Sequence, residues 1–162
     1  MSSPESPERL ALMARVGTLV SRWQDAVQRY DQLVGDHEGL TQTERHCIAL
    51  LVGGAMAPHE IATGIHLTRA AVTSLLDRLE ARGLVQRSPD ANDRRRLIVA
   101  LTRDGLDLCE RHYGGLMERG QGLLASMSDA DLTAMVRFLD EALMLQGQVT
   151  EELLLRAGGK RA

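Results

Sequence analysis

The stretch from residue 57 to residue 101 constrains the fold more than any other part of the sequence. Residues 57–62 have the composition of a short helix and residues 65–67 that of a turn, while Thr68 can cap a second helix that runs to about residue 82. Gly83 follows, at a position where a left-handed backbone commonly ends a helix. Two short helices joined by three or four residues predict a helix-turn-helix.

A two-stranded hairpin is expected directly after it. Residues 84–87 and 97–101 are rich in aliphatic side chains, and the segment between them, residues 88–93, consists mostly of turn formers. Alternation along the second strand should turn one set of side chains toward the core, namely Leu97, Val99 and Leu101. A basic hairpin that follows a helix-turn-helix predicts a wing.

Long helices are expected on both sides of this unit. Apolar side chains recur at steps of three and four through residues 9–34, and residues 35–39, with a glycine at each end, should terminate that helix. A further helix should begin near residue 102, with Leu106 on its apolar seam, and a last one, capped near residue 128, should extend to about residue 155. Glycines between residues 114 and 122 predict a kink or a close helix approach.

The predicted fold class is mainly α with a small β-hairpin wing: a winged helix-turn-helix with long N- and C-terminal dimerisation helices. We expect a disordered lead at residues 1–8, a helical dimerisation region at residues 9–39 and 104–157, and the winged helix-turn-helix at residues 40–103. The terminal helices carry more apolar surface than a small lobe could cover, which favours a two-fold homodimer. The sequence has neither a long apolar span nor the pattern of a signal peptide, so we expect a cytoplasmic protein without a membrane partner.

Charge is distributed unevenly along the chain. Residues 68–103 contain eight arginines and four acidic residues, a balance of +4 within a chain whose net charge is −3. A basic stripe on an acidic body is typical of a protein that holds polyphosphate on one face. The charge excess by itself would also fit a solvated helix face with ordinary ion pairs. The local sequence pattern has to decide between that interpretation and a polyphosphate-binding surface.

Three motifs resemble the MarR (multiple antibiotic resistance) family of regulators. The segment from Asp93 to Thr102 reads DRRRLIVALT, and the family's wing signature is D-x-R-x-x-x-V-x-L-T. Residues 72–85 resemble the family's recognition helix and its exit into the wing, and the helix that follows Leu40 and Thr41 is similar to the family's second helix. The motifs occur in order and with the expected spacing over roughly residues 40–105, so the chain is identified as a member of this family.

The resemblance implies which helical side chains contact DNA. Four at the start of the second short helix would reach base edges and phosphates in a major groove: Thr68, Arg69, Thr73 and Ser74. A role for Thr68 as a helix cap alone stays open, and family members often carry a basic residue where this chain has Ser74. Arg78 and Arg82, farther along, are expected to contact phosphate or to form intrahelical ion pairs. Ala57 stands where a capping serine or threonine is common in the family.

The resemblance also assigns roles at the wing tip. Arg95 would enter a narrow minor groove, to which its guanidinium is attracted. Asp93 would orient Arg95 through an ion pair, and Arg94 and Arg96 would contact phosphates.

A small-molecule effector is implied as well, because family members commonly bind small, often anionic aromatic ligands between the dimer helices and the DNA-binding lobe. The residues that could line such a pocket are Arg15, Trp23, Tyr30 and His46. Trp23 and Tyr30 share a helical seam, so packing is the alternative role for both.

Metal and redox sensing are weaker alternatives. Several possible zinc ligands fall near the first, second and fifth helices: His37, Glu38, His46, Cys47, Glu110 and His112. Their spacing shows no clear ligand set, and neither a metal nor a cofactor is predicted. Cys47 and Cys109 lie on apolar helix faces, where inert cysteines are usual.

The sequence therefore predicts a dimeric, sequence-specific DNA-binding transcriptional regulator, a ligand-responsive repressor that binds a pseudo-palindromic duplex site. Its expected partners are double-stranded DNA, a second copy of the chain and a small-molecule effector. A winged-helix protein-interaction module is the alternative. The sequence does not indicate an enzyme, because no nucleophile–base pair, metal set or phosphate-binding loop is evident.

Overall fold

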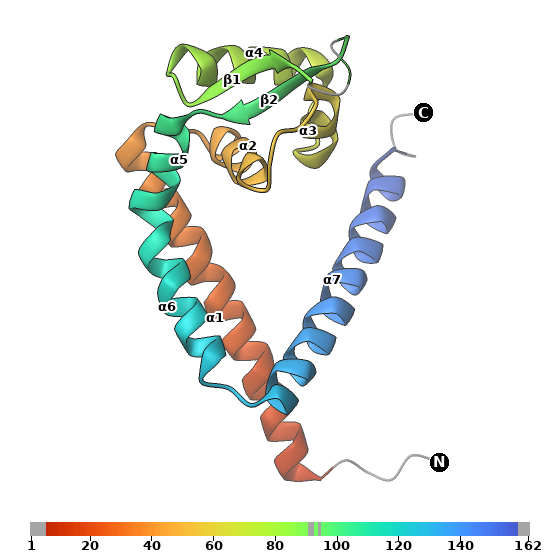
Figure 1. Cartoon of the computed structure of the whole chain (residues 1–162). Coiled ribbons are helices and arrows are strands. Elements are labelled where there is room, and N and C mark those ends of the chain that lie inside the picture. Colours follow the sequence, from red (N-terminus) through yellow and green to blue (C-terminus); the bar gives the residue numbers. More distant parts are fainter. Residues whose placement is uncertain (1–5, 91–92, 94, 159–162) are drawn as a thin grey trace. The chain divides into compact units, whose positions relative to one another are not determined.

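The structure, a computed structural model, describes residues 6–90, 93 and 95–158 (Figure 1). The chain divides into two compact units between His112 and Tyr113, and each unit is considered by itself. Within the described ranges, none of the helices combines the length and apolar character that a membrane span requires.

The first helix, α1 (Pro7–Glu38), is longer than its sequence pattern indicates. It begins after the N-cap Ser6, and it continues through Gly35 to end at Gly39, whose φ of 62° is left-handed. Gly35 does not end the helix but allows a close approach: a Cβ there would lie 1.9 Å from Nη1 of Arg45. That guanidinium donates to the carbonyl of Leu40. The helix therefore ends within the predicted segment 35–39, at its second glycine, while the first glycine makes room for a neighbouring side chain.

α2 follows Leu40 and Thr41 as expected, and the two helices after it lie close to the predicted residues. In α2 (Gln42–Val52) the Thr41 hydroxyl accepts from the Glu44 N–H, and the Glu44 carboxylate accepts from the Thr41 N–H, which is a complete capping box. In α3 (Pro58–Gly64) the cap residue Ala57 has no side-chain oxygen, and only the Glu60 carboxylate bonds back to the Ala57 N–H. α4 (Arg69–Ala81) begins after the N-cap Thr68.

The wing is an antiparallel hairpin of β1 (Val85–Pro89) and β2 (Leu97–Leu101). Val85 lies opposite Leu101, and Met56 adds a short bridge to Val99 on the other edge of β2. Val99 and Leu101 are buried as predicted, whereas the prediction for Leu97 was wrong, because that side chain is 44% exposed. Leu97 pairs with Pro89 at the tip end of the hairpin, beyond the reach of the core.

The core lies between α2, α3, α4 and the hairpin, with β1 against α4 and β2 against α2 (Figure 1). Its largest fully buried side chains come from all of these elements: Cys47, Ile61, Val72, Leu75, Leu76, Leu79, Val85 and Val99. Burial raises the pKa of the Cys47 thiol to about 11, so this thiol stays protonated and unreactive at neutral pH. The expectation of an inert thiol agrees with this environment.

The helix predicted after the wing is interrupted. α5 (Arg103–Cys109) begins after the N-cap Thr102 and leads into a π-helical turn, η1 (Glu110–Gly114). In α5 the core contact is made by Leu108, which is 4% exposed, whereas Leu106 of the predicted seam is 47% exposed.

The second unit contains α6 (Gly115–Ala125) and α7 (Asp129–Gly158). The Ser128 hydroxyl accepts from the Asp131 N–H at the start of α7, as the sequence predicts.

Gly105 tests the packing of α5 against the wing. A Cβ at this position would lie 2.2 Å from the backbone oxygen of Leu84, a contact that side-chain movement cannot relieve. We expect Gly105→Ala to lower the free energy of unfolding by about 3 kcal/mol, measured by urea denaturation. Gly17→Ala is the matched control, because nothing lies within 4 Å of that Cβ and alanine favours a helix. Equal stabilities of the two variants would contradict this close packing of α5 against Leu84.

Candidate nucleic-acid interface

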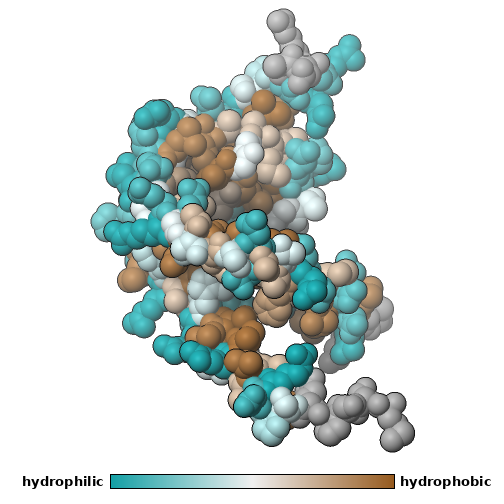
Figure 2. All heavy atoms as spheres, turned by 60° about the horizontal axis from the view of Figure 1, so that its bottom comes forward, coloured by the Kyte–Doolittle hydropathy of each residue, from teal (hydrophilic) through white to brown (hydrophobic). Residues whose placement is uncertain are grey.

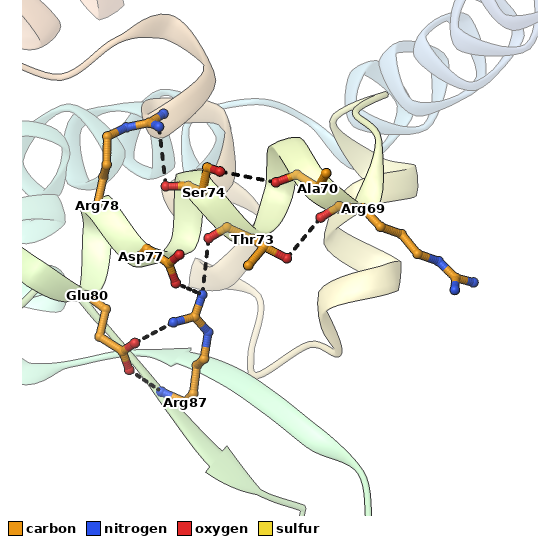
Figure 3. Close-up of polar contacts among 8 residues, drawn as sticks. All are labelled: Arg69, Ala70, Thr73, Ser74, Asp77, Arg78, Glu80 and Arg87. Carbon is orange, nitrogen blue, oxygen red and sulfur yellow. Dashed lines mark hydrogen bonds and ion pairs between the residues drawn. The ribbon is translucent and has the colours of Figure 1, made fainter.

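The first two turns of α4 present a polar face to solvent (Figure 3). Thr68, Arg69, Thr73 and Ser74 are all exposed, so the structure brings the four predicted side chains onto one surface. The Thr68 hydroxyl accepts from the Ala71 N–H at 3.3 Å, which confirms its role as a cap. The hydroxyls of Thr73 and Ser74 donate to the carbonyls of Arg69 and Ala70, so their oxygen lone pairs face outward.

The wing tip carries further predicted residues. Asp93, Arg95 and Arg96 are exposed, while Arg94 lies outside the described residues. The Asp93 carboxylate accepts from the backbone N–H of Arg95 at 3.0 Å. It forms this turn contact in place of the expected ion pair, since within the described part of the chain the Arg95 guanidinium has no acidic partner. Asp93 therefore fixes the backbone at the tip and leaves the Arg95 side chain unconstrained.

A hollow joins α3, α4 and the wing. Arg69 and Thr73 line it from α4, His59 lines it from the start of α3, and Arg96 and Leu97 line it from the wing. Two cations from segments far apart in the sequence thus border one depression.

Arg78 and Arg82 have structural partners. Arg78 Nε lies 3.0 Å from Oε1 of Glu44, whose side chain is 6% exposed. Arg82 donates to the carbonyl of Gly39 at 2.8 Å and to that of Glu38 at 2.6 Å. Both arginines join α4 to preceding helices, so the expected intrahelical ion pairs of these two residues were wrong. These contacts give both arginines a structural role that does not depend on phosphate.

Arg87 in β1 was missed as a structural residue by sequence reasoning (Figure 3). Its guanidinium lies 2.7 Å from Asp77 and 2.5 Å from Glu80, both on α4. Its backbone N–H also donates to Glu80. The sequence signal was present in the acidic residues at positions 77 and 80, which share the side of α4 next to the hairpin. Arg87 thereby sets the position of the wing relative to α4.

The arginines of the basic segment fall into two groups. Four bond carboxylates or carbonyls within the chain: Arg78, Arg82, Arg87 and Arg103. In the described part of the segment, the guanidiniums of Arg69, Arg95 and Arg96 have no hydrogen-bond or ion-pair partner. These three are the charges left available for an external anion.

The predicted effector residues do not form one compact set. Arg15, Trp23 and Tyr30 follow one another along α1, and His46 lies on the exposed side of α2. Arg15 and Tyr30 are roughly 22 Å apart along the helix axis, at 1.5 Å per residue, so one small ligand would not contact both. The Tyr30 hydroxyl donates to the carbonyl of His112, and Trp23 is 60% exposed. An effector site at these residues remains a prediction.

Comparison with known proteins agrees with this geometry. The MarR family model matches residues 40–97, which include the helix-turn-helix and the base of the wing. Residues 40–97 are a MarR-family domain. The multiple antibiotic resistance protein MarR of Salmonella typhimurium is 31% identical over 88 residues, which cover 52% of this chain and 61% of that protein. The homoprotocatechuate degradative operon repressor of Escherichia coli is 25% identical over 130 residues, covering 80% of this chain and 88% of the repressor.

Solved structures share the fold of this chain over a longer stretch than the MarR-family domain alone. A Staphylococcus aureus MepR variant bound to an oligodeoxyribonucleotide has a TM-score of 0.52 and 25% identity, over 83% of this chain and 97% of MepR. The transcriptional regulator Tm0710 from Thermotoga maritima has a TM-score of 0.59 and 20% identity, over 83% of this chain and 96% of that one. The predicted fold class, a mainly helical winged helix, is confirmed.

The pair of Glu44 and Arg78 predicts a pH dependence of stability. Burial opposes ionisation of Glu44, but the hydrogen bonds from Thr41 and the charge of Arg78 outweigh it and hold the pKa of this carboxyl below its ordinary value. A carboxyl with a lowered folded-state pKa stabilises the fold above its unfolded pKa of about 4.3, and this stabilisation is lost as pH falls through the folded value.

We expect Glu44→Gln to cost about 2 kcal/mol at pH 7 and progressively less below pH 4, measured by chemical denaturation across pH. A cost that stays the same from pH 7 to pH 3 would show that the charge of Glu44 is not what stabilises α2 against α4.

Proposed function

We propose that this chain is a DNA-binding transcriptional regulator that grips duplex DNA with the start of α4 and the wing. The observation that carries the proposal is a set of exposed guanidiniums that have no partner among the residues the structure describes: Arg69, Arg95 and Arg96. Unpaired surface arginines gain most from an anionic partner with closely spaced charges, and the phosphates of DNA provide one. The MepR complex with an oligodeoxyribonucleotide supports the same assignment.

The two parts of the surface suit different grooves. The exposed face of α4 begins at the helix N-terminus, where residues of a recognition helix contact base edges. Because Thr73 and Ser74 donate their hydroxyl protons to the helix backbone, they would accept hydrogen bonds from base amino groups. Arg95, whose backbone is fixed by Asp93, would enter the minor groove beside the major-groove contact.

Dimerisation is part of the proposal. Large apolar side chains are exposed along α1 and α7, and brown hydrophobic residues are visible among teal polar ones on the face shown in Figure 2. On α7 the exposed large apolar side chains include several that are three or four residues apart, and the full set is Met135, Val136, Phe138, Leu139, Leu143, Met144, Leu145, Val149, Leu153, Leu154 and Leu155. A single chain would leave these side chains in water, and a second copy would cover them. A two-fold dimer would present two copies of α4 to a pseudo-palindromic site.

We further propose that the chain acts as a repressor whose affinity for DNA responds to a small molecule. The support is the similarity to the homoprotocatechuate degradative operon repressor over most of both chains. A ligand that binds one conformation of the dimer more tightly would shift the population away from the DNA-binding form.

A protein-interaction module with the same fold is the alternative function. A protein interface usually excludes charge from its centre, whereas the surface of α4 and the wing exposes three arginines that have no partner in the described part of the chain. The two functions differ in their response to salt, because duplex binding releases counterions and weakens steeply as salt concentration rises.

Arg95→Ala tests the role of the wing. We expect it to weaken binding to a selected duplex site by roughly 1–3 kcal/mol, measured by fluorescence anisotropy at fixed salt. Arg103→Ala is the matched control, since it removes the same charge from a guanidinium that already pairs with Asp107. Unchanged binding by the Arg95 variant, or an equal loss in both, would refute a specific wing contact.

Leu143→Glu tests the dimer. Leu143 is 71% exposed in the single chain, and a carboxylate at a buried subunit interface would be strongly unfavourable. We expect light scattering to give the mass of two chains for the native protein and a shift toward one chain for the variant. Gln148→Glu adds the same charge at an exposed polar position of α7 and should leave the mass unchanged. A native protein that elutes as a monomer would contradict this assembly.

A further inference from the structure

Three side chains with metal-binding atoms meet at the C-terminal end of α1. His37 and Glu38 are the last two residues of that helix, and His112 belongs to the π-helical turn η1. One ligand atom from each lies within 4.8 Å of the others, the group being His37, Glu38 and His112. The Nε2 atom of His112 is 2.5 Å from Oε1 of Glu38, and Nδ1 of His37 is 3.4 Å from the same oxygen.

The surroundings of this group favour a cation. The Glu38 carboxylate lies beside both histidine rings and brings a negative charge to the group. The C-terminal end of a helix, where His37 and Glu38 lie, carries partial negative charge that attracts a positive ion. The positive charge of Arg111 opposes cation binding, since its Nη2 lies 3.9 Å from Oε1 of Glu38. The Arg111 side chain is 60% exposed, however, and can extend into water.

We propose that His37, Glu38 and His112 bind one zinc ion per chain, with a remaining coordination position open to water. Two imidazole nitrogens and a carboxylate oxygen form a ligand set that suits zinc, whereas magnesium and calcium prefer oxygen ligands alone. Tetrahedral ligands at about 2.0–2.1 Å from zinc are roughly 3.3 Å apart, which lies between the shortest and longest separations in this group. Small side-chain rotations would therefore create the site without moving the backbone.

The local backbone gives independent support. π-helical turns are rare, are usually single turns, and occur frequently at functional sites. Here the turn coincides with His112, whose carbonyl accepts from the Tyr30 hydroxyl while its ring faces Glu38. The His112 side chain is 19% exposed, so its position is set by contacts on both sides. A purely structural role as an ion pair between α1 and η1 is the competing explanation.

The test is metal titration of the full chain, using cobalt as a spectroscopic probe and zinc by calorimetry. We expect visible absorption bands from bound cobalt, displacement of cobalt by zinc, and a stoichiometry of one zinc per chain. His112→Ala should weaken zinc affinity roughly tenfold or more, because even loss of a group that only orients a ligand costs that much.

Glu38→Gln keeps the shape of the side chain but removes the anionic ligand, and it decides the matter if the His112 variant fails to fold. His46→Ala is the matched control: this histidine lies on the exposed side of α2, outside the group of three. Absence of zinc binding by the native chain would overturn the proposal. So would zinc affinity that is unchanged in Glu38→Gln, or reduced equally in His46→Ala.

Discussion

α4 is held on three sides, and the rest of the winged helix depends on this arrangement. One face of the helix is buried in the core through Leu75, Leu76 and Leu79, each at most 1% exposed. Charged contacts fix it laterally: Arg78 to α2, Arg82 to the end of α1, and Arg87 from the wing. A helix anchored in this way can expose its first two turns to a ligand without changing its own position.

The same chemical group therefore has two uses in this protein. A guanidinium beside a buried carboxylate or a helix-terminal carbonyl satisfies groups that would otherwise be costly to bury, as at Glu44. A guanidinium without such a neighbour stays in water and keeps its full charge for an external partner. Local net charge does not separate these uses, because it counts Arg87 and Arg95 alike. Only the positions of the acidic residues in space distinguish them.

The end of α1 links the proposed zinc site to the proposed DNA-binding surface. Glu38 offers its carboxylate to the metal-binding group, and its backbone carbonyl accepts from Arg82 at the end of α4. A zinc ion bound by the Glu38 carboxylate would therefore lie one contact away from α4.

The sequence by itself determined the elements of the winged helix, because their signals are local. The capping box at Thr41, the cap at Thr68, the glycine at position 83 and the alternation that buries Val99 each act within a few residues. Tertiary structure decided the features that depend on distant neighbours. The Arg45 guanidinium packs so closely against α1 that only a glycine fits at position 35. Leu97 is exposed because the core ends before the wing tip.

The same division holds for the candidate sites. A resemblance in sequence could identify Arg69 and Arg95, since their roles follow from their places in a motif. It could not show that Arg82 caps α1, or that His112 meets His37 and Glu38, because these partners are 43 or more residues apart in the chain. Such pairings depend on how helices pack, and packing is set by the shape of the whole core rather than by any local pattern.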